Sequence, residues 1–508
     1  MKTCVIIGGG LGGLVTGALL AKEGYQVTVL EKNAIIGGGL QMFKRKGVSF
    51  PTGMHIFGGF HEGENMRKLF GYLGIMDKMS LQPMDDDAFD VVSVLSDGTT
   101  YRLPKGKENF VAYLSERFPS EKEHLKAYYD KLFDLSKEEA LFYLQETPSS
   151  AFPKFSDDFI LPWDALMDLY LSDPKLKGLL TYMNSLFDGE PGTTPAFLQA
   201  LLSVLHLKGT FQFVGGSQQM AKALAEVIEK AGGQVLANEE VEKIVVEDRR
   251  VTQVVTKKGH VYRADNYISA IHTDVLLRII SPNAFSTAFV QRVKAIPETF
   301  SSFKVYVKFK EKTFRYINHT HYCMNDYDSM SRFRAVQPNE WPQGLMYLTP
   351  VEAHQDEYAQ TMVIICTMSY EWVRQWENTK TGHRGADYEQ WKQAMTDKVL
   401  DFMEKFHPDF RQCIDAVFAS SPLTIRDYYG NKEGSNYGFQ KDGNDIMLSQ
   451  MSVFTKVKNL FLTGQNVNIH GLCGVSLTAI ETAEALVGHN AIVHKINEAY
   501  IRNDKDKL

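Results

Sequence analysis

Hydrophobic positions near the N-terminus form two short runs that enclose a glycine-rich turn and a helix. Residues 2–7 and 26–30 are mostly apolar, which is typical of strands buried in a parallel sheet. Residues 8–13 contain five glycines, and residues 14–22 continue as an apolar helix. No charged residue occurs from 4 to 21, but the glycines and flanking strands favour a strand–turn–helix unit over a membrane span or a signal peptide.

A second pattern of the same kind occupies residues 213–271. A Gly-Gly turn at 214–217 is followed by Met220, Leu224 and Val227 at helical spacing. Short apolar runs then predict strands at residues 234–236, 241–246, 251–255, 260–263 and 264–270. We expect these strands to form a small β-meander that returns to a buried strand.

The C-terminal pattern repeats this alternation. Residues 459–463 predict a buried strand, residues 464–466 a turn, and an apolar helix is predicted to begin near Gly474. The three patterns together predict an α/β fold with a Rossmann-type nucleotide-binding domain. We expect this domain to be discontinuous and to be built from residues 1–73, 213–281 and 455–508.

Two long insertions interrupt that domain. Residues 74–212 are rich in aromatic and aliphatic side chains, which predicts mainly helical core. Residues 282–454 contain alternating patterns at 303–309 and 362–368, which predict strands of a mixed sheet. We expect these insertions to bind the substrate, and the apolar density of the first also suits a lipid tunnel or a face that rests on a membrane.

Composition narrows the class of protein. The chain has 508 residues, enough for two or three domains, and its net charge of -6 argues against nucleic acid as a partner. Its five cysteines are scattered without a C-x-x-C pair, which suits a reducing, cytoplasmic location. His319 and His321 lack an evident third ligand, so no metal site is expected.

The N-terminal glycines have distinct predicted roles in binding a dinucleotide. Gly8 makes the tight turn, Gly10 lets a pyrophosphate approach the backbone, and Gly13 lets the helix pack closely on the strand. The helix N-terminus offers free N–H groups and partial positive charge to the phosphates. Glu31, at the end of the second strand, can accept hydrogen bonds from an adenosine ribose.

Five motifs, taken in order, resemble one known family. They are the N-terminal turn, the glycines at 37–39, the Phe-x-x-Gly-x-His stretch at 50–55, the Gly-Gly turn and helix at 215–224, and Thr-Gly-Gln at 463–465. In this order they resemble the FAD-dependent phytoene desaturase, carotenoid isomerase and retinol saturase family. Tyr429, Gly430, Gly434, Tyr437 and Gly438 strengthen the similarity to its all-trans-retinol 13,14-reductase-like members.

The resemblance implies an FAD cofactor and a set of residues that bind it. These residues are Gly8, Gly10, Leu11, Gly12, Gly13, Glu31, Lys32, Gly38, Gly39, Val241, Gly464, Gln465, Gly474 and Val475. The chain departs from the family pattern at three places, and each concerns polar contacts only. No arginine follows Gly38, Pro51-Thr52 stands where many members have an acid, and Gln465 stands where many members have a second acid. An amide can still hydrogen-bond a ribityl hydroxyl.

Two histidines are candidate catalytic groups. His55 and His470 lie in the segments that the family places near the flavin ring, and an imidazole can donate or accept a proton near neutral pH. Either histidine can instead be structural, with hydrogen bonds to the backbone. The helix near Gly474 would favour the reduced flavin anion through its N-terminal charge, and Cys473 is expected to be a buried, unreactive thiol.

The resemblance implies an oxidoreductase that adds hydrogen to, or removes it from, a carbon–carbon double bond of an apolar polyene or isoprenoid. The alternatives are a redox-neutral cis–trans isomerase, a flavin amine oxidase and a non-catalytic prenyl- or lipid-binding escort protein. Because no second dinucleotide motif occurs, we expect electrons to pass to or from a diffusible carrier, a quinone or the substrate. A lipophilic substrate also suggests peripheral contact with a membrane.

Overall fold

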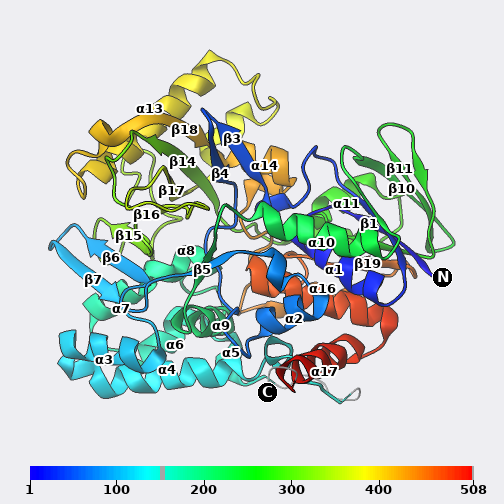
Figure 1. Cartoon of the computed structure of the whole chain (residues 1–508), viewed down its shortest axis with the longest axis horizontal. Coiled ribbons are helices and arrows are strands. Elements are labelled where there is room, and N and C mark those ends of the chain that lie inside the picture. The colour runs from blue at the N-terminus through cyan, green and yellow to red at the C-terminus, as the bar shows by residue number, and fades with distance from the viewer. Residues whose placement is uncertain (149–154, 506–508) are drawn as a thin grey trace.

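A five-stranded parallel sheet forms the nucleotide-binding side of the molecule (Figure 1). The computed structural model describes residues 1–148 and 155–505. The strands, in their order across the sheet, are β19 (Leu460–Leu462), β13 (Asn266–Ser269), β1 (Thr3–Ile7), β2 (Gln26–Leu30) and β9 (Gln234–Leu236). Three segments that are far apart in the sequence therefore share one sheet, which confirms the predicted α/β class. The domain limits at residues 73, 212, 281 and 454 stay predictions.

Three helices cover this sheet, and the central one is α1 (Leu11–Lys22). It packs against both α10 (Gln218–Lys230) and α16 (Gly471–Val487). Helix α16 begins three residues before the predicted start, after an N-cap at His470. A Cβ at Gly474 would lie 2.6 Å from Cβ of Ile469, so this glycine permits close packing inside the first turn instead of starting the helix.

The predicted meander differs from the structure in one strand. β10 (Val241–Glu247), β11 (Arg250–Thr256) and β12 (Val261–Tyr262) form a separate antiparallel sheet. β9 does not join them, because Val235 pairs with Val29 of β2 and extends the parallel sheet. Pairing with strands far away in the sequence decides which sheet a short strand joins, and hydrophobic periodicity does not reveal that pairing.

A seven-stranded mixed sheet lies above a layer of helices in Figure 1. Its strands, in order, are β18 (Ile414–Ser420), β14 (Ser301–Phe309), β17 (Thr361–Met368), β16 (Gly344–Leu348), β15 (Thr320–Met324), β6 (Asp90–Val94) and β7 (Thr99–Leu103). Neighbours are antiparallel except for β6 and β15, which run parallel. The first insertion, predicted to be mainly helical, therefore also supplies two strands, because β6 pairs with a strand more than 200 residues away.

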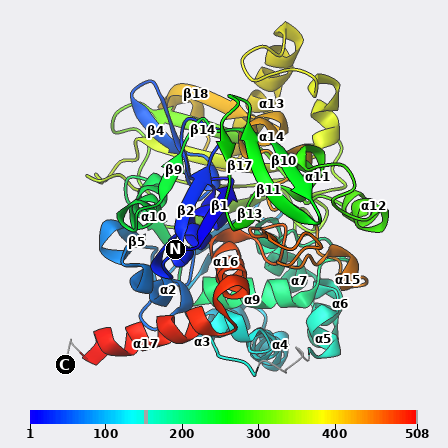
Figure 2. The ribbon, with the colours of Figure 1, turned by 90° about the vertical axis from the view of Figure 1, so that its right-hand side faces the viewer.

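Helices of the first insertion form a layer below this sheet, and Figure 2 shows them beside α16 and α17 (Ala491–Lys505). They are α3 (Lys107–Arg117), α4 (Lys122–Ser136), α5 (Asp157–Ile160), α6 (Trp163–Tyr170), α7 (Pro174–Leu180), α8 (Asn184–Phe187) and α9 (Ala196–Leu207). One buried apolar cluster includes side chains of α1, α4, α9 and α16, so the layer and the nucleotide-binding side share a core.

The remaining α-helices and strands lie between or around these layers, and one of them, α13, packs on the mixed sheet. They are β3 (Met42–Arg45), β4 (Val48–Pro51), α2 (Asn65–Leu73), β5 (Leu81–Pro83), β8 (Phe211–Phe213), α11 (Thr273–Ile279), α12 (Thr287–Ala295), α13 (Ala386–Glu404), α14 (Pro422–Tyr429) and α15 (Ile446–Ser449). Within the described ranges, no helix by itself is long and apolar enough to cross a bilayer. Only α16 and α17 together reach that length and composition, with a bend of 115° between them.

Candidate functional site

One cavity of about 450 Å³ begins where the parallel strands end. Residues just past β1, β2, β13 and β19 line it, among them Gly8, Glu31, Ile271 and Gly464. Ligands of open α/β sheets bind at this carboxyl edge. The cavity continues from there to the helical layer and the mixed sheet, so one space joins the two sides of the molecule.

The N-terminal turn has a geometry that only glycine fits at two positions. Gly8 has φ +108°, a left-handed conformation that side chains rarely adopt. A Cβ at Gly13 would lie 2.0 Å from the carbonyl oxygen of Gly8, so this glycine lets α1 approach β1. At Gly10 the nearest atom to a Cβ would be Cα of Gly38 at 4.0 Å, and this backbone is open to the cavity.

Glu31 holds the turn and faces the same cavity. Its carboxylate accepts hydrogen bonds from the backbone N–H of Gly9 at 2.9 Å and of Asn33 at 2.8 Å. A carboxylate offers about four acceptor positions, so positions remain for ribose hydroxyls. The neighbouring Lys32 also lines the cavity, but its ammonium donates to the carbonyl of Asp427 at 2.8 Å, and burial lowers its pKa.

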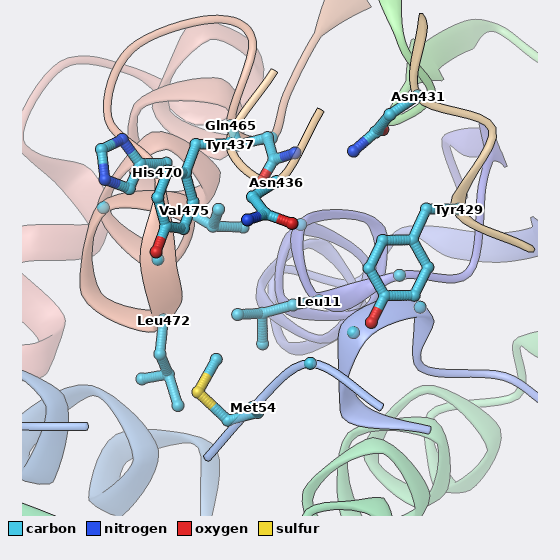
Figure 3. Close-up of a pocket in the computed structure, with 18 of the residues that line it drawn as sticks. Leu11, Met54, Tyr429, Asn431, Asn436, Tyr437, Gln465, His470, Leu472 and Val475 are labelled. Carbon is cyan, nitrogen blue, oxygen red and sulfur yellow. The ribbon is translucent and has the colours of Figure 1, made fainter. Parts of the chain in front are cut away.

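The second glycine group lies against the first. The N–H of Gly37 donates to the carbonyl of Gly9 at 2.7 Å, and Gly38 has φ +55° beside Gly10. Tyr429 of α14 covers the backbone at Gly39 and Gly53. A Cβ at Gly53 would lie 2.4 Å from the Tyr429 hydroxyl oxygen. In the sequence Tyr429 only strengthens the family resemblance, whereas the structure places its ring on the wall of the cavity (Figure 3).

The C-terminal motif closes the opposite wall. A Cβ at Gly12 would lie 3.0 Å from Cα of Gly464, and the hydroxyls of Thr16 and Thr463 are hydrogen-bonded at 3.1 Å. Gln465 and Val475 line the cavity together with Leu11, and Figure 3 labels all three side chains. Of the residues predicted to bind the cofactor, these thirteen line the cavity: Gly8, Gly10, Leu11, Gly12, Glu31, Lys32, Gly38, Gly39, Val241, Gly464, Gln465, Gly474 and Val475. Gly13 does not line it, because it is packed between α1 and β1.

Both candidate histidines line this cavity, but their surroundings differ. The His470 ring stacks on Tyr437 with centroids 4.2 Å apart, and its Nε2–H donates to the carbonyl of Leu186 at 3.2 Å. Burial lowers the pKa of His470 to about 4. This environment resembles the structural alternative, in which the histidine anchors the start of α16.

His55 has no such anchor. Neither of its ring nitrogens has a hydrogen-bond partner among the described residues, although both are inaccessible to solvent. Burial, and next the positive charge of Lys304, lower the pKa of His55 well below its ordinary value. The ring is therefore neutral at physiological pH and free to hydrogen-bond a ligand. Its catalytic role stays a prediction.

Lys304 is a candidate functional residue that the sequence analysis did not identify. It lies on β14, lines the cavity, and donates from Nζ to the carbonyl of Thr52 at 2.8 Å. Burial lowers its pKa to about 8. Alternation along residues 303–309 indicated a strand, but only the partner strands show that position 304 faces the cavity instead of solvent.

Two other expectations concern thiols and metals. Cys473 is buried on the cavity wall, as expected, and burial raises its pKa to about 12. That the thiol is unreactive stays a prediction. All five cysteines are unpaired. His321 hydrogen-bonds Ser93 and Tyr347, and the described part of the chain contains no group of three ligands that could hold a metal ion.

The far wall of the cavity is apolar. It is formed by side chains of the helical layer and the mixed sheet, namely Phe142, Leu186, Phe187, Leu198, Leu201, Leu202, Leu205, Met330, Leu345, Met346 and Ile365. The arrangement fits FAD, because the open backbone at Gly10 and Gly464 can accept a pyrophosphate and Glu31 can accept ribose hydroxyls. It leaves an apolar space beyond the flavin end.

Comparison with known proteins agrees with this geometry. The chain is 25% identical over 548 residues to the all-trans-retinol 13,14-reductase of Homo sapiens, across 99% of this chain and 88% of the relative. It is 23% identical to the 1-hydroxycarotenoid 3,4-desaturase of a Flavobacterium species, across 97% of this chain and the whole relative. An oxidoreductase structure from Methanosarcina mazei shares the fold, with a TM-score of 0.64 at 16% identity over 95% of this chain and all of its own.

A family model identifies the chain more directly. The model described as flavin containing amine oxidoreductase matches residues 11–487, which begin within the N-terminal turn and include α1, both insertions and α16. The family match confirms the predicted FAD cofactor, and the protein is a flavin-containing oxidoreductase. The chain belongs to the flavin containing amine oxidoreductase family.

Proposed function

We propose that this protein adds two hydrogen atoms to, or removes them from, a carbon–carbon double bond of a polyene or isoprenoid substrate. The observation that carries the proposal is the single cavity that joins the glycine turn to a wall of leucine, phenylalanine and methionine side chains. An apolar wall binds hydrocarbon and excludes water from the reacting carbons. The names of the two relatives, a retinol reductase and a carotenoid desaturase, support the same substrate class.

The chain's own residues have separable tasks in this reaction. Bound FAD supplies or accepts the hydride. The turn at residues 8–13 and Glu31 bind the cofactor, and the leucines of α9 orient the hydrocarbon. Lys304 carries a proton below about pH 8, whereas His55 is neutral, so Lys304 holds the proton that accompanies the hydride and His55 is free to hydrogen-bond the substrate.

The charges along the cavity disfavour an amine substrate. Among the described residues that line the cavity, the carboxylates are Glu31, Glu239 and Glu240. All three lie at the nucleotide end, where the N–H of Glu239 donates to the carbonyl of Glu31 at 2.8 Å. A cationic amine at the apolar end would meet Lys304 without a counter-charge, which costs free energy. A cis–trans isomerase would use the same apolar wall and stays the alternative.

Mass analysis of the product tests the function. Oxidised and chemically reduced holoprotein are each incubated anaerobically with retinol, carotenes and other lipophilic alkenes. A gain of two hydrogens with reduced protein identifies a saturase, a loss of two with oxidised protein a desaturase, and an unchanged mass with altered geometry an isomerase. Turnover of primary amines without reaction of any alkene would contradict the proposal.

We also propose peripheral contact with a membrane and electron exchange with a diffusible carrier or quinone. Leu169 of α6 and Met447 of α15 are 69% and 74% exposed, and α6 and α15 lie on one side of the molecule in Figure 2. Asp164 at the start of α6 and Asn444 before α15 both hydrogen-bond Gly192, so the two helices are neighbours. Flotation with liposomes tests this contact, and Leu169→Ser with Met447→Ser should reduce it.

A further inference from the structure

One helix supplies most of the apolar wall and also one polar side chain. Helix α9 lines the cavity with Leu198, Leu201, Leu202, Leu205 and His206. The spacing i, i+3, i+4, i+7 and i+8 places these five residues on one face of the helix. His206 is therefore a polar position at the C-terminal end of an otherwise apolar stripe.

The His206 ring is buried and has no hydrogen-bond partner in the part of the chain that the structure describes. The residue is 4% exposed, and neither ring nitrogen has a hydrogen-bond partner among the described residues. The nearest aromatic neighbour is Phe89, with ring centroids 6.3 Å apart. A buried polar group without a partner costs free energy unless a ligand or a bound water satisfies it.

Another buried histidine shows what a structural role looks like in this fold. His272 is 3% exposed, its Nε2 pairs with the carboxylate of Glu298 at 3.1 Å, and its Nδ1 accepts from the N–H of Asp274. Both of its ring nitrogens are thus used within the protein. The His206 nitrogens are not, although the side chain is equally buried and borders the substrate end of the cavity.

The chemistry of a neutral imidazole defines the group that fits it. Burial lowers the pKa of His206 to about 4, so the ring has one N–H donor and one acceptor nitrogen at neutral pH. The two ring nitrogens point in different directions, so one hydroxyl pairs with one of them. Because a hydroxyl can both donate and accept, it fits whichever nitrogen faces the cavity. A carboxylate offers no donor, and a pure hydrocarbon would leave both nitrogens unpaired.

We propose that His206 binds the hydroxyl group of the substrate and selects polyene alcohols against hydrocarbons of the same length. This inference rests on the proposed function, because it assigns the substrate of the same cavity more narrowly. His206 is then a specificity-determining residue. The stripe of leucines binds the chain of the polyene, and the histidine fixes the position of its polar end.

Binding to the oxidised holoprotein without an electron donor tests the inference apart from turnover. The probes are all-trans-retinol and its analogue with a methyl group in place of the hydroxymethyl group, and flavin fluorescence reports binding. We expect the wild type to bind the alcohol about tenfold more tightly than the analogue, as one well-placed hydrogen bond allows. His206→Leu should reduce the ratio of the two affinities to about one, mainly by weakening the binding of the alcohol.

Two further variants separate recognition from packing. His206→Gln keeps one donor and one acceptor and should retain part of the preference, and it also serves if His206→Leu does not fold. Leu202→Met, on the same stripe, should leave the ratio unchanged while altering both affinities together. FAD content and melting temperature are measured for every variant.

The outcomes distinguish the two proposals. If both probes bind but the ratio is the same in the wild type, His206→Leu and His206→Gln, the role of His206 is wrong and the polyene function stands. If neither probe binds the wild-type holoprotein, the proposed polyene function fails, and the inference about His206 fails with it.

Discussion

The two ends of the cavity are built in different ways. At the nucleotide end the walls are backbone, and the decisive positions are glycines where a side chain would collide or fill the ligand space. At the substrate end the walls are large side chains from α8, α9, β16 and β17. Substitution should therefore act in an all-or-none manner at the first end and in a graded manner at the second, because apolar side chains of similar volume can replace one another.

The largest effect is expected from Gly13→Ala. A Cβ there would lie 2.0 Å from a backbone carbonyl oxygen, so α1 must move away from β1 and the sheet loses its cover. We expect a loss of about 3 kcal/mol or more in the free energy of unfolding, with loss of bound FAD. Gly71→Ala in α2 is the control, since no atom lies within 4 Å of its Cβ. Equal melting temperatures for the two variants would contradict the backbone-built description.

Gly10→Val should separate FAD binding from folding. The protein itself has room for a side chain at this position, but the cavity on that side is where we place the pyrophosphate. We expect FAD affinity to fall about 10- to 100-fold while the apoprotein melts like wild-type apoprotein. Flavin absorbance after gel filtration measures the first quantity and calorimetry the second. Stoichiometric FAD in the purified variant would place the phosphates elsewhere.

His55→Ala should slow product formation by about 10- to 100-fold, as the loss of one hydrogen bond to a buried substrate group allows. FAD content and melting temperature should be retained, because the His55 nitrogens have no hydrogen-bond partner among the described residues. His470→Ala is the matched comparison. It loses the bond to Leu186 and the stack on Tyr437, so we expect it to lower the melting temperature first. The assignment of the two histidines is reversed if His55→Ala unfolds and His470→Ala is stable but inactive.

Lys304→Met tests the buried cation through pH. The pKa of Lys304 falls from 10.5 to about 8 in the folded protein, so between these values the unfolded chain binds more protons. The free energy of unfolding therefore rises with pH across this window. Below pH 8 the buried ammonium is charged, and the full cost of burying that charge lowers the stability. The melting temperature of Lys304→Met minus that of the wild type should therefore be about 2–5 °C larger at pH 7 than at pH 10. A melting difference that does not vary with pH would show that Lys304 is solvated.

Glu31→Gln should have the smallest effect. The amide keeps one acceptor but weakens the charge-assisted bonds to the N–H groups of Gly9 and Asn33 and to the ribose. We expect FAD affinity to fall about tenfold in a titration of the apoprotein. An unchanged affinity would mean that Glu31 serves the turn alone and does not contact the ribose.

The sequence predicted the nucleotide end far better than the substrate end, for a physical reason. The turn, α1, β2 and Glu31 lie within about thirty consecutive residues, so their spacing in the chain determines their spacing in space. Lys304 and His206 face the cavity only because β14 and α9 pack against elements far away in the sequence. Periodicity located that strand, but it could not show which side of it faces a ligand.

The same difference explains one wrong prediction and one missed pairing. The meander was expected to include residues 234–236, and the mainly helical first insertion was not expected to add strands to the mixed sheet. β9 and β6 belong to other sheets because of their partners β2 and β15, and no local pattern encodes those pairings. The start of α16 was misplaced because Gly474 signals packing against Ile469 as strongly as it signals a helix end.

The pairing of β1 constrains the order in which the protein can mature during translation. Strand β1 can pair with β2 early, but its other neighbour is β13, where Cys4 pairs with Asn266, and β13 in turn pairs with β19, where Tyr267 pairs with Leu460. The sheet is therefore completed only by strands made near the middle and the end of the chain. Contacts of such long sequence separation form slowly. Capture of FAD is therefore a late event, and nascent chains that stop before residue 460 lack one wall of the cofactor cradle.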